Sequence, residues 1–167
     1  SGASEPFGEE LMKVLVLSGL DPVWVRPDVD SATGLPLALP SERVAAALAE
    51  APDACGVFLV EPSFVGVLSD LPRVAEVSHA AGVSLVVDQA WGAHLGFHPD
   101  LPPHSIALGA DGFVTSAHKT LAAFTQSAYL LARGERLDLA RLDESFELLH
   151  TTSVSAAVGQ GTSSSVA

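Results

Sequence analysis

Two residues with complementary chemistry follow separate apolar runs of this chain. Asp88 places a carboxylate directly after residues 83–87 (VSLVV), and Lys119 places an amine shortly after residues 112–115 (GFVT). A lysine amine can form a Schiff base with an aldehyde, and a carboxylate can keep a ring nitrogen protonated. Together the two side chains suit a site that holds both ends of a pyridoxal ring.

The elements that must position these residues are two short strands. Residues 83–87 form an apolar, β-branched run of the kind found in strands buried on both faces, so Asp88 stands where that strand ends. The run 112–115 predicts a second strand, which leads into Ser116, His118 and Lys119. Ligands of open α/β sheets bind outside the carboxyl ends of the strands. We therefore expect both strand ends to face one pocket.

Lys119 is one of only two lysines, the other being Lys13, and its neighbours along the chain carry no other full charge. An amine in apolar surroundings is suited to covalent chemistry with a carbonyl group. The alternative is an ordinary lysine whose stem lies along the sheet edge while its head reaches water. The presence of Asp88 at the neighbouring strand end favours the first reading.

The chain resembles the major domain of the Orn/Lys/Arg decarboxylases, fold-type I enzymes that use pyridoxal 5'-phosphate (PLP). The motifs that carry the resemblance are 16–20 (VLSGL), 34–37 (GLPL), 61–66 (EPSFVG), 88–94 (DQAWGAH), 96–103 (GFHPDLPP), 109–111 (GAD), 115–126 (TSAHKTLAAFTQ) and 149–153 (LHTTS). The resemblance implies an α/β fold: a three-layer sandwich with a mostly parallel sheet, as in the aspartate-aminotransferase-like large domain, here in part. It covers residues 11–153, the partial major domain, and segment 1–10 does not match. The Gly- and Ser-rich composition near the end predicts a flexible tail at 154–167.

Carried over to this sequence, the resemblance implies a role for each of several residues. Lys119 would bind the aldehyde of the cofactor, and Asp88 would pair with the protonated ring nitrogen. Ala90 would pack against one face of the ring. Ser116 and His118 match positions that help to hold the phosphate.

Three further residues are candidates for the substrate side of the site. Trp91 and His94 belong to the same motif as Asp88, and Glu61 follows the apolar run 56–60 (GVFLV) directly before Pro62. The resemblance places the 62–64 segment near the substrate. For Glu61, a capping role is an equally good interpretation. His79, on the polar side of a predicted helix, is interpreted as solvated, and no residue is assigned to a metal.

The implied activity is the PLP-dependent decarboxylation of arginine, lysine or ornithine to an amine of the polyamine pathway. One alternative is another fold-type I enzyme, an aminotransferase or a lyase, because a lysine and an aspartate at these strand ends suit all of them. A second alternative is a catalytically silent fragment. It is motivated by the lack, in this sequence, of the family's phosphate-binding small-residue loop and ring-stacking histidine.

Composition and charge limit the classes of molecule that the chain is expected to bind. The 167 residues are 48% apolar, enough for one domain with a sizeable core. A formal net charge of −12 disfavours nucleic acid and anionic membranes, since phosphate contacts need clustered basic residues. We expect a basic amino acid as the small-molecule partner and, from the resemblance, a homodimer or higher homo-oligomer. No apolar stretch approaches the length of a membrane span. The single cysteine, Cys55, allows no internal disulfide and is expected to be buried. We therefore expect a reducing compartment, the cytoplasm.

Helices and strands are predicted to alternate, as in a parallel sheet with crossover helices. A helix should end near Gly19, and strands are expected at 21–26, 56–60, 83–87, 112–115 and 127–132, the last running back after the lysine. Two amphipathic helices are expected, one capped by Ser41 and one by Asp70.

Overall fold

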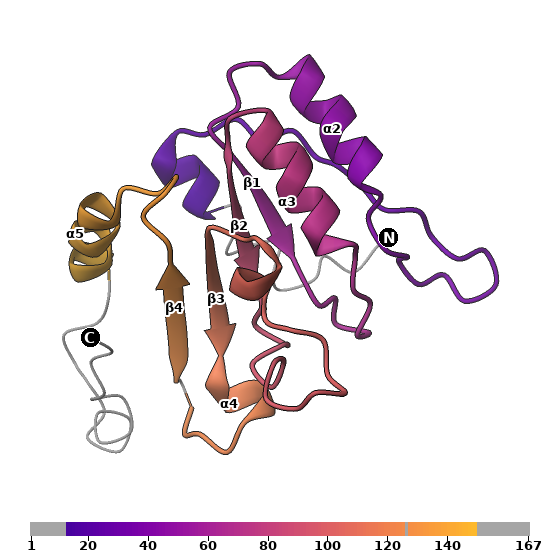
Figure 1. Cartoon of the computed structure of the whole chain (residues 1–167), viewed down its shortest axis with the longest axis vertical. Helices are drawn as coiled ribbons and strands as arrows, with labels where there is room; N and C mark the ends of the chain where they lie inside the picture. Colours follow the sequence, from indigo (N-terminus) through magenta and orange to yellow (C-terminus); the bar gives the residue numbers. More distant parts are fainter. Residues whose placement is uncertain (1–12, 126, 150–167) are drawn as a thin grey trace.

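The computed structural model describes residues 13–125 and 127–149. The expected segments 1–10 and 154–167 lie outside this part of the chain. The fold is a four-stranded sheet in the order β1-β2-β3-β4 (Figure 1). The strands are β1 Gly56–Val60, β2 Ser84–Asp88, β3 Gly112–Ser116 and β4 Ala128–Ala132.

The first three strands are parallel, and β4 is antiparallel to β3. Helix α2 Ser41–Glu50 precedes β1, and helix α3 Leu71–Ala80 crosses from β1 to β2. The connection from β2 to β3 contains the 3₁₀ turn η1 Ser105–Leu108. Short α4 Ala117–Thr120 follows β3, and α5 Leu139–Leu149 follows β4. This order confirms the predicted α/β class with a mostly parallel sheet. Parallel strands need a crossover connection, which α3 provides between β1 and β2 and the longer segment with η1 provides between β2 and β3.

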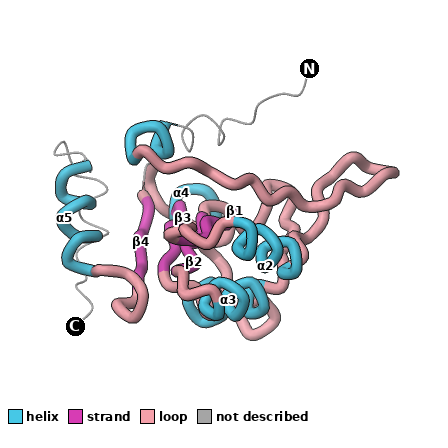
Figure 2. The backbone as a smooth tube through the Cα atoms, turned by 90° about the horizontal axis from the view of Figure 1, so that it is seen from above, coloured by secondary structure: helices cyan, strands magenta, loops and turns pink. Residues whose placement is uncertain are grey.

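Helices α2 and α3 lie on the same side of the sheet (Figure 2). Their apolar stripes pack on the alternate strand residues that point to that side. The core is made of Val44, Leu59, Leu71, Val74, Ala75, Leu85, Val87, Ala110 and Phe113. On the other side of the sheet, Phe58 is 49% exposed, Val60 41% and Leu130 42%. We call these three residues and the sheet surface around them the open face.

The helix starts show how local sequence sets the boundaries. Asp70 caps α3 by accepting a hydrogen bond from the Arg73 N–H, as expected. For α2 the cap prediction was wrong, since Pro40 occupies the cap position and Ser41 is the first helical residue. Proline, with its fixed φ and missing N–H, is tolerated at a helix start.

Three other expectations from the sequence are corrected. Residues 21–26 form no strand; Trp24 is 55% exposed, and no described strand lies beside this segment to pair with it. Cys55 is exposed rather than buried. His79 is not simply solvated, because its Nε2 lies 2.8 Å from a carboxylate oxygen of Asp111.

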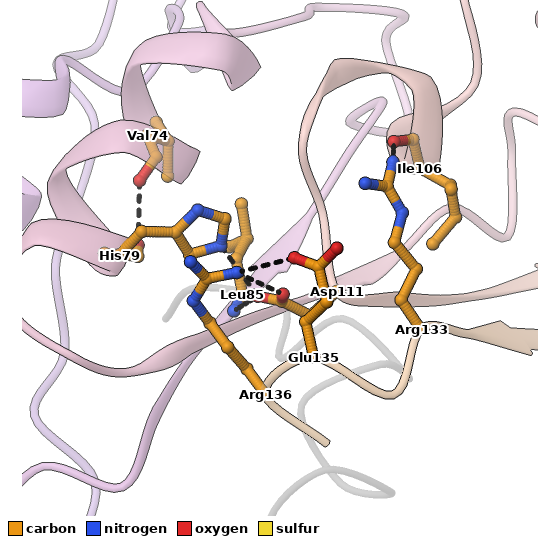
Figure 3. Close-up of polar contacts among 9 residues, drawn as sticks. Val74, His79, Leu85, Ile106, Asp111, Arg133, Glu135 and Arg136 are labelled. Atoms are coloured by element: carbon orange, nitrogen blue, oxygen red, sulfur yellow. Dashed lines mark hydrogen bonds and ion pairs between the residues drawn. The ribbon is translucent and has the colours of Figure 1, made fainter. Parts of the chain in front are cut away.

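Asp111 joins several elements at the amino-terminal edge of the parallel strands (Figure 3). Its side chain is 3% exposed and accepts hydrogen bonds from the Leu85 N–H at 2.8 Å, from His79 at 2.8 Å and from Arg136 at 3.4 Å. Burial by itself would raise the pKa of Asp111. The hydrogen bonds from Leu85, His79 and Arg136, together with the electrostatic attraction of His79, outweigh burial, and the pKa of Asp111 is lowered.

Candidate active site

The carboxyl ends of β1, β2 and β3 meet at one edge of the sheet, opposite the edge that holds Asp111 (Figure 1). Asp88 is the last residue of β2, paired in register with Val60 of β1 and Val114 of β3. β3 ends at Ser116, and α4 begins at the next residue. The parallel register thus brings the two predicted strand ends to the same edge.

Asp88 is half-buried, and its carboxylate has a fixed local partner. Its Oδ1 accepts a hydrogen bond from the Ala90 N–H at 2.9 Å, which turns the chain directly after the strand. The Ala90 side chain is buried in this turn, at 7% exposure. The Asp88 carbonyl also accepts a bond from the Glu61 N–H, so the ends of β1 and β2 are joined backbone to backbone.

Lys119 lies in α4 and meets the turn that follows β2. Its Nζ lies 4.9 Å from the centroid of the Trp91 ring, a cation–π distance. The structure therefore brings Lys119 and Trp91 together from segments separated by β3. Lys119 itself is exposed at this edge.

His118 links the lysine segment to Ser127, the residue directly before β4. Its Nδ1 lies 2.9 Å from the Ser127 carbonyl oxygen, and its backbone N–H donates to the same oxygen. Because a carbonyl can only accept, Nδ1 carries the hydrogen, and Nε2 is the ring nitrogen left for a ligand. Ser116 stands at the cap position of α4, and its hydroxyl makes no capping bond there.

A cleft of about 320 Å³ opens beside Trp91. Its walls come from the loop after β1 and the loop after β2: Pro62, Ser63, Phe64, Gly66, Leu68, Trp91, His94, Leu95, Leu101 and Pro102. Nδ1 of His94 is buried and has no hydrogen-bond partner in the described part of the chain. The cleft thus combines an aromatic wall with a histidine whose Nδ1 is left without a partner among the described residues.

Glu61 lies apart from that cleft, in an adjoining cavity of about 70 Å³. It is 4% exposed, and its Oε2 accepts a hydrogen bond from the Ser69 N–H at 2.9 Å. Burial raises the pKa of Glu61, and the bonds from Ser69 counteract only part of that effect. The structure therefore groups Lys119, Trp91 and His94 on the exposed edge but places Glu61 inside.

One polar residue of this edge was not singled out from the sequence. Gln89, between Asp88 and Ala90, is 1% exposed and makes several hydrogen bonds, among them those to Ser105. The only signal in the sequence is a polar residue with a long side chain within an otherwise small or apolar turn.

Comparison with known proteins adds the family context. Residues 9–163 match the family model described as Orn/Lys/Arg decarboxylase, major domain. The chain is 35% identical over 147 residues to an arginine decarboxylase of Bacillus subtilis (strain 168), and 34% identical over 147 residues to one of Halalkalibacterium halodurans. Each match covers 88% of this chain and 30% of the relative. The chain thus spans about 30% of the length of these relatives.

Among solved structures, the chain is similar to N-succinyldiaminopimelate aminotransferase from Mycobacterium tuberculosis, with a TM-score of 0.65 and 21% identity. The match covers 89% of this chain and 38% of that protein. At this identity the likeness shows the fold. It confirms the expected aspartate-aminotransferase-like large domain, present in part.

Proposed function

The chain belongs to the Orn/Lys/Arg decarboxylase family, and we propose that it provides the cofactor side of a PLP site that decarboxylates a basic amino acid. The observation that carries the proposal is the shared edge of β2 and β3. It presents a carboxylate, Asp88, and, through α4, the amine of Lys119. Arginine, lysine and ornithine are the proposed substrates; the matched relatives are named arginine decarboxylases.

The side chains at this edge fit the chemical groups of PLP. The cofactor has an aldehyde for an amine, a ring nitrogen for a carboxylate, and a phosphate for hydroxyl and imidazole groups. Lys119 and Asp88 supply the first two, and the Ser116 hydroxyl with Nε2 of His118 would supply the third. Ala90 is small enough to lie flat against a ring face.

When bound, PLP supplies a protonated ring that accepts the electron pair left as carbon dioxide departs. The task of Asp88 is to hold the proton on the ring nitrogen, and its bond from the Ala90 N–H fixes the carboxylate for that task. His118, tied to Ser127, keeps the segment that carries Lys119 in place. The amine of Lys119 would hold the cofactor at its aldehyde.

The substrate side of the proposal rests on the cleft beside Trp91. Its apolar walls suit the methylene chain of a basic amino acid, and the Trp91 ring already lies next to the lysine nitrogen. His94 lines the same cleft and is the proposed polar contact of the substrate there. Glu61, inside its own cavity and hydrogen-bonded to Ser69, is proposed to have a structural role. A homo-oligomer in the cytoplasm belongs to the same proposal and rests on the family.

Borohydride trapping tests the proposal directly. The chain is incubated with PLP, reduced, digested and examined by mass spectrometry for the pyridoxyl group. We expect saturable labelling at Lys119 that is lost in Lys119→Ala. Carbon dioxide release is then measured with arginine, lysine and ornithine.

Lys13 is the built-in control, because it is the only other lysine of the chain. Equal labelling of Lys13 and Lys119, or no saturable labelling, would contradict the proposal. That result would favour the alternative of a silent fragment.

A further inference from the structure

Gln89 lies directly after the carboxylate of the candidate site and points to the opposite side of the sheet. Neighbouring residues of an extended chain project to opposite faces, so Asp88 and Gln89 diverge. The Gln89 side chain is buried at 1% exposure, whereas Asp88 is half-buried at the site. Gln89 touches none of the groups proposed to hold the cofactor, yet it is covalently joined to two of them, Asp88 and Ala90.

The amide of Gln89 is hydrogen-bonded at both ends. Its Oε1 accepts from the Ser105 N–H at 2.9 Å and from the Ser105 hydroxyl. Its Nε2 donates to the Gly92 carbonyl at 2.9 Å. A buried amide is stable only with such partners, so these bonds select one position for the side chain.

The backbone of Gln89 is held as firmly as its side chain. Its N–H donates to the Val114 carbonyl at 2.7 Å, which continues the link between β2 and β3 beyond Asp88. Its carbonyl accepts from the Gly92 N–H at 2.8 Å and from the Thr115 hydroxyl at 2.8 Å. Gln89 therefore ties the turn after β2 to β3 and to η1.

Gly92 packs against Gln89 more closely than any other residue type could. A Cβ added at Gly92 would lie 2.7 Å from Cγ of Gln89 and 2.8 Å from Cδ of Pro62. A side chain at position 92 would therefore displace Gln89 or Pro62, so glycine allows this close packing. The turn is thus held on its buried side by Gln89, while the half-buried Asp88 carboxylate lies on its other side.

We propose that Gln89 is the positioning residue of this site: its buried amide sets the direction of the Asp88 carboxylate and the place of Ala90. The identity of the group that Asp88 and Ala90 receive, PLP, rests on the proposed function. The positioning itself is a property of the chain without ligand, so it can be tested separately.

Gln89→Met tests the proposal, because methionine has a similar length and no hydrogen-bonding amide. Hydrogen exchange is measured on the ligand-free chain for the amides of Ala90 and Gly92, which bond within the turn. We expect their exchange to rise by about tenfold or more, the effect of losing buried hydrogen bonds. The Asp111 amide, bonded to the Leu85 carbonyl at the opposite edge, should keep its protection.

The second measurement is PLP affinity, followed by the visible absorption of the bound cofactor. Gln89→Met should weaken binding by about tenfold or more and shift the absorption band, since Asp88 no longer faces the ring nitrogen. Val74→Ala is the matched control. Val74 is fully buried in α3, away from this edge, so its truncation lowers stability without touching the turn.

A second variant, Gln89→Glu, should restore the hydrogen bonds of the turn when its carboxyl group is protonated. A protonated glutamic acid can accept from Ser105 and donate to Gly92, as glutamine does, but the ionised form cannot donate. We expect amide protection near the wild-type level at acidic pH and a loss as pH rises. Wild-type protection of the turn should not follow this pH dependence.

The outcomes separate the two proposals. If the wild-type chain binds no PLP, the proposed function fails for this chain, and the exchange measurement by itself decides the role of Gln89. Unchanged protection of Ala90 and Gly92 in Gln89→Met would overturn the positioning role. The positioning role is equally overturned if Val74→Ala, at equal loss of stability, disturbs the turn and PLP binding as strongly.

Discussion

At the scale of single residues, the site separates its charged groups by environment. Asp88 and Lys119 lie at the accessible edge of the sheet, whereas Glu61, next to Asp88 through a backbone bond, is buried. An accessible carboxylate can meet a ligand cation. A buried one must either find partners or accept a proton, and the pKa of Glu61 is raised accordingly.

Glu61→Gln should therefore change the pH dependence of stability. The raised pKa means that folded Glu61 binds a proton more tightly than unfolded Glu61. Wild-type stability then falls as pH rises from the ordinary glutamic acid pKa through the raised value. The glutamine variant stays neutral and can still accept a hydrogen bond from the Ser69 N–H. Its free energy of unfolding should therefore rise relative to that of the wild type as pH rises.

Urea denaturation of both proteins across the acidic to neutral range measures this difference. The exposed Glu50→Gln is the matched control for the loss of one negative charge. A constant difference between wild type and Glu61→Gln at all pH values would contradict the prediction.

At the scale of elements, two polar groups join the sheet to what surrounds it, one at each edge. Gln89 ties the carboxyl edge to η1, and Asp111 ties the amino edge to α3 and to the segment after β4 (Figure 3). Apolar packing holds the middle of the sheet against the helices but has little direction. The hydrogen bonds at both edges fix the register and the exits of the strands.

Asp111→Asn should destabilise the fold by about 2–3 kcal/mol at neutral pH, because His79 and Arg136 lose their carboxylate while the Leu85 N–H keeps an acceptor. The lowered pKa gives the sign of the pH effect. The contribution of Asp111 is present above the ordinary aspartic acid pKa and is lost as pH falls through the lowered value.

Denaturation in urea, with and without the substitution, checks this prediction from neutral to strongly acidic pH. Asp100→Asn makes the same chemical change at a side chain that is 91% exposed, and should alter stability by less than about 0.5 kcal/mol. An Asp111→Asn protein as stable as Asp100→Asn would show that the contacts in Figure 3 contribute little.

At the scale of the whole molecule, the sheet is covered unevenly. Helices α2 and α3 bury one side, and Phe58, Val60 and Leu130 remain about half-exposed on the open face. Neighbouring apolar side chains in contact with water favour association or dye binding. Among the described residues no helix is long and apolar enough to cross a membrane.

We expect the isolated chain to bind the dye ANS and to self-associate as its concentration rises. Phe58→Thr combined with Leu130→Thr should reduce both effects, because threonine keeps strand propensity while removing apolar surface. Stability should fall by about 1–3 kcal/mol in total, because each of the two half-exposed side chains contributes roughly half of the free energy of a fully buried one.

Sedimentation velocity and ANS fluorescence measure the result. Val87→Thr is the matched control on the covered side, where the side chain is 0% exposed; it should cost about 2 kcal/mol and leave the open face unchanged. A wild-type chain that stays monomeric without binding the dye would rule out this view of the open face.

The sequence by itself determined the order of the main elements and the ends of the strands. Apolar runs closed by Asp88 and by Ser116 predicted β2 and β3, and β4 was expected to run back. These predictions succeeded because strand periodicity and turn residues act over a few neighbouring positions. The two residues with the clearest chemistry, Asp88 and Lys119, were found in the same way.

Only the tertiary structure decided which polar side chains are buried and what they bond. From the sequence, His79 was interpreted as solvated, Glu61 as a substrate-side or capping residue, and Gln89 was not singled out. In the structure each of the three meets partners or cavity walls from distant segments. The prediction of a strand at 21–26 was wrong because no described strand lies beside this segment to pair with it. Burial and pairing depend on contacts between residues far apart in the chain, and local sequence does not encode those contacts.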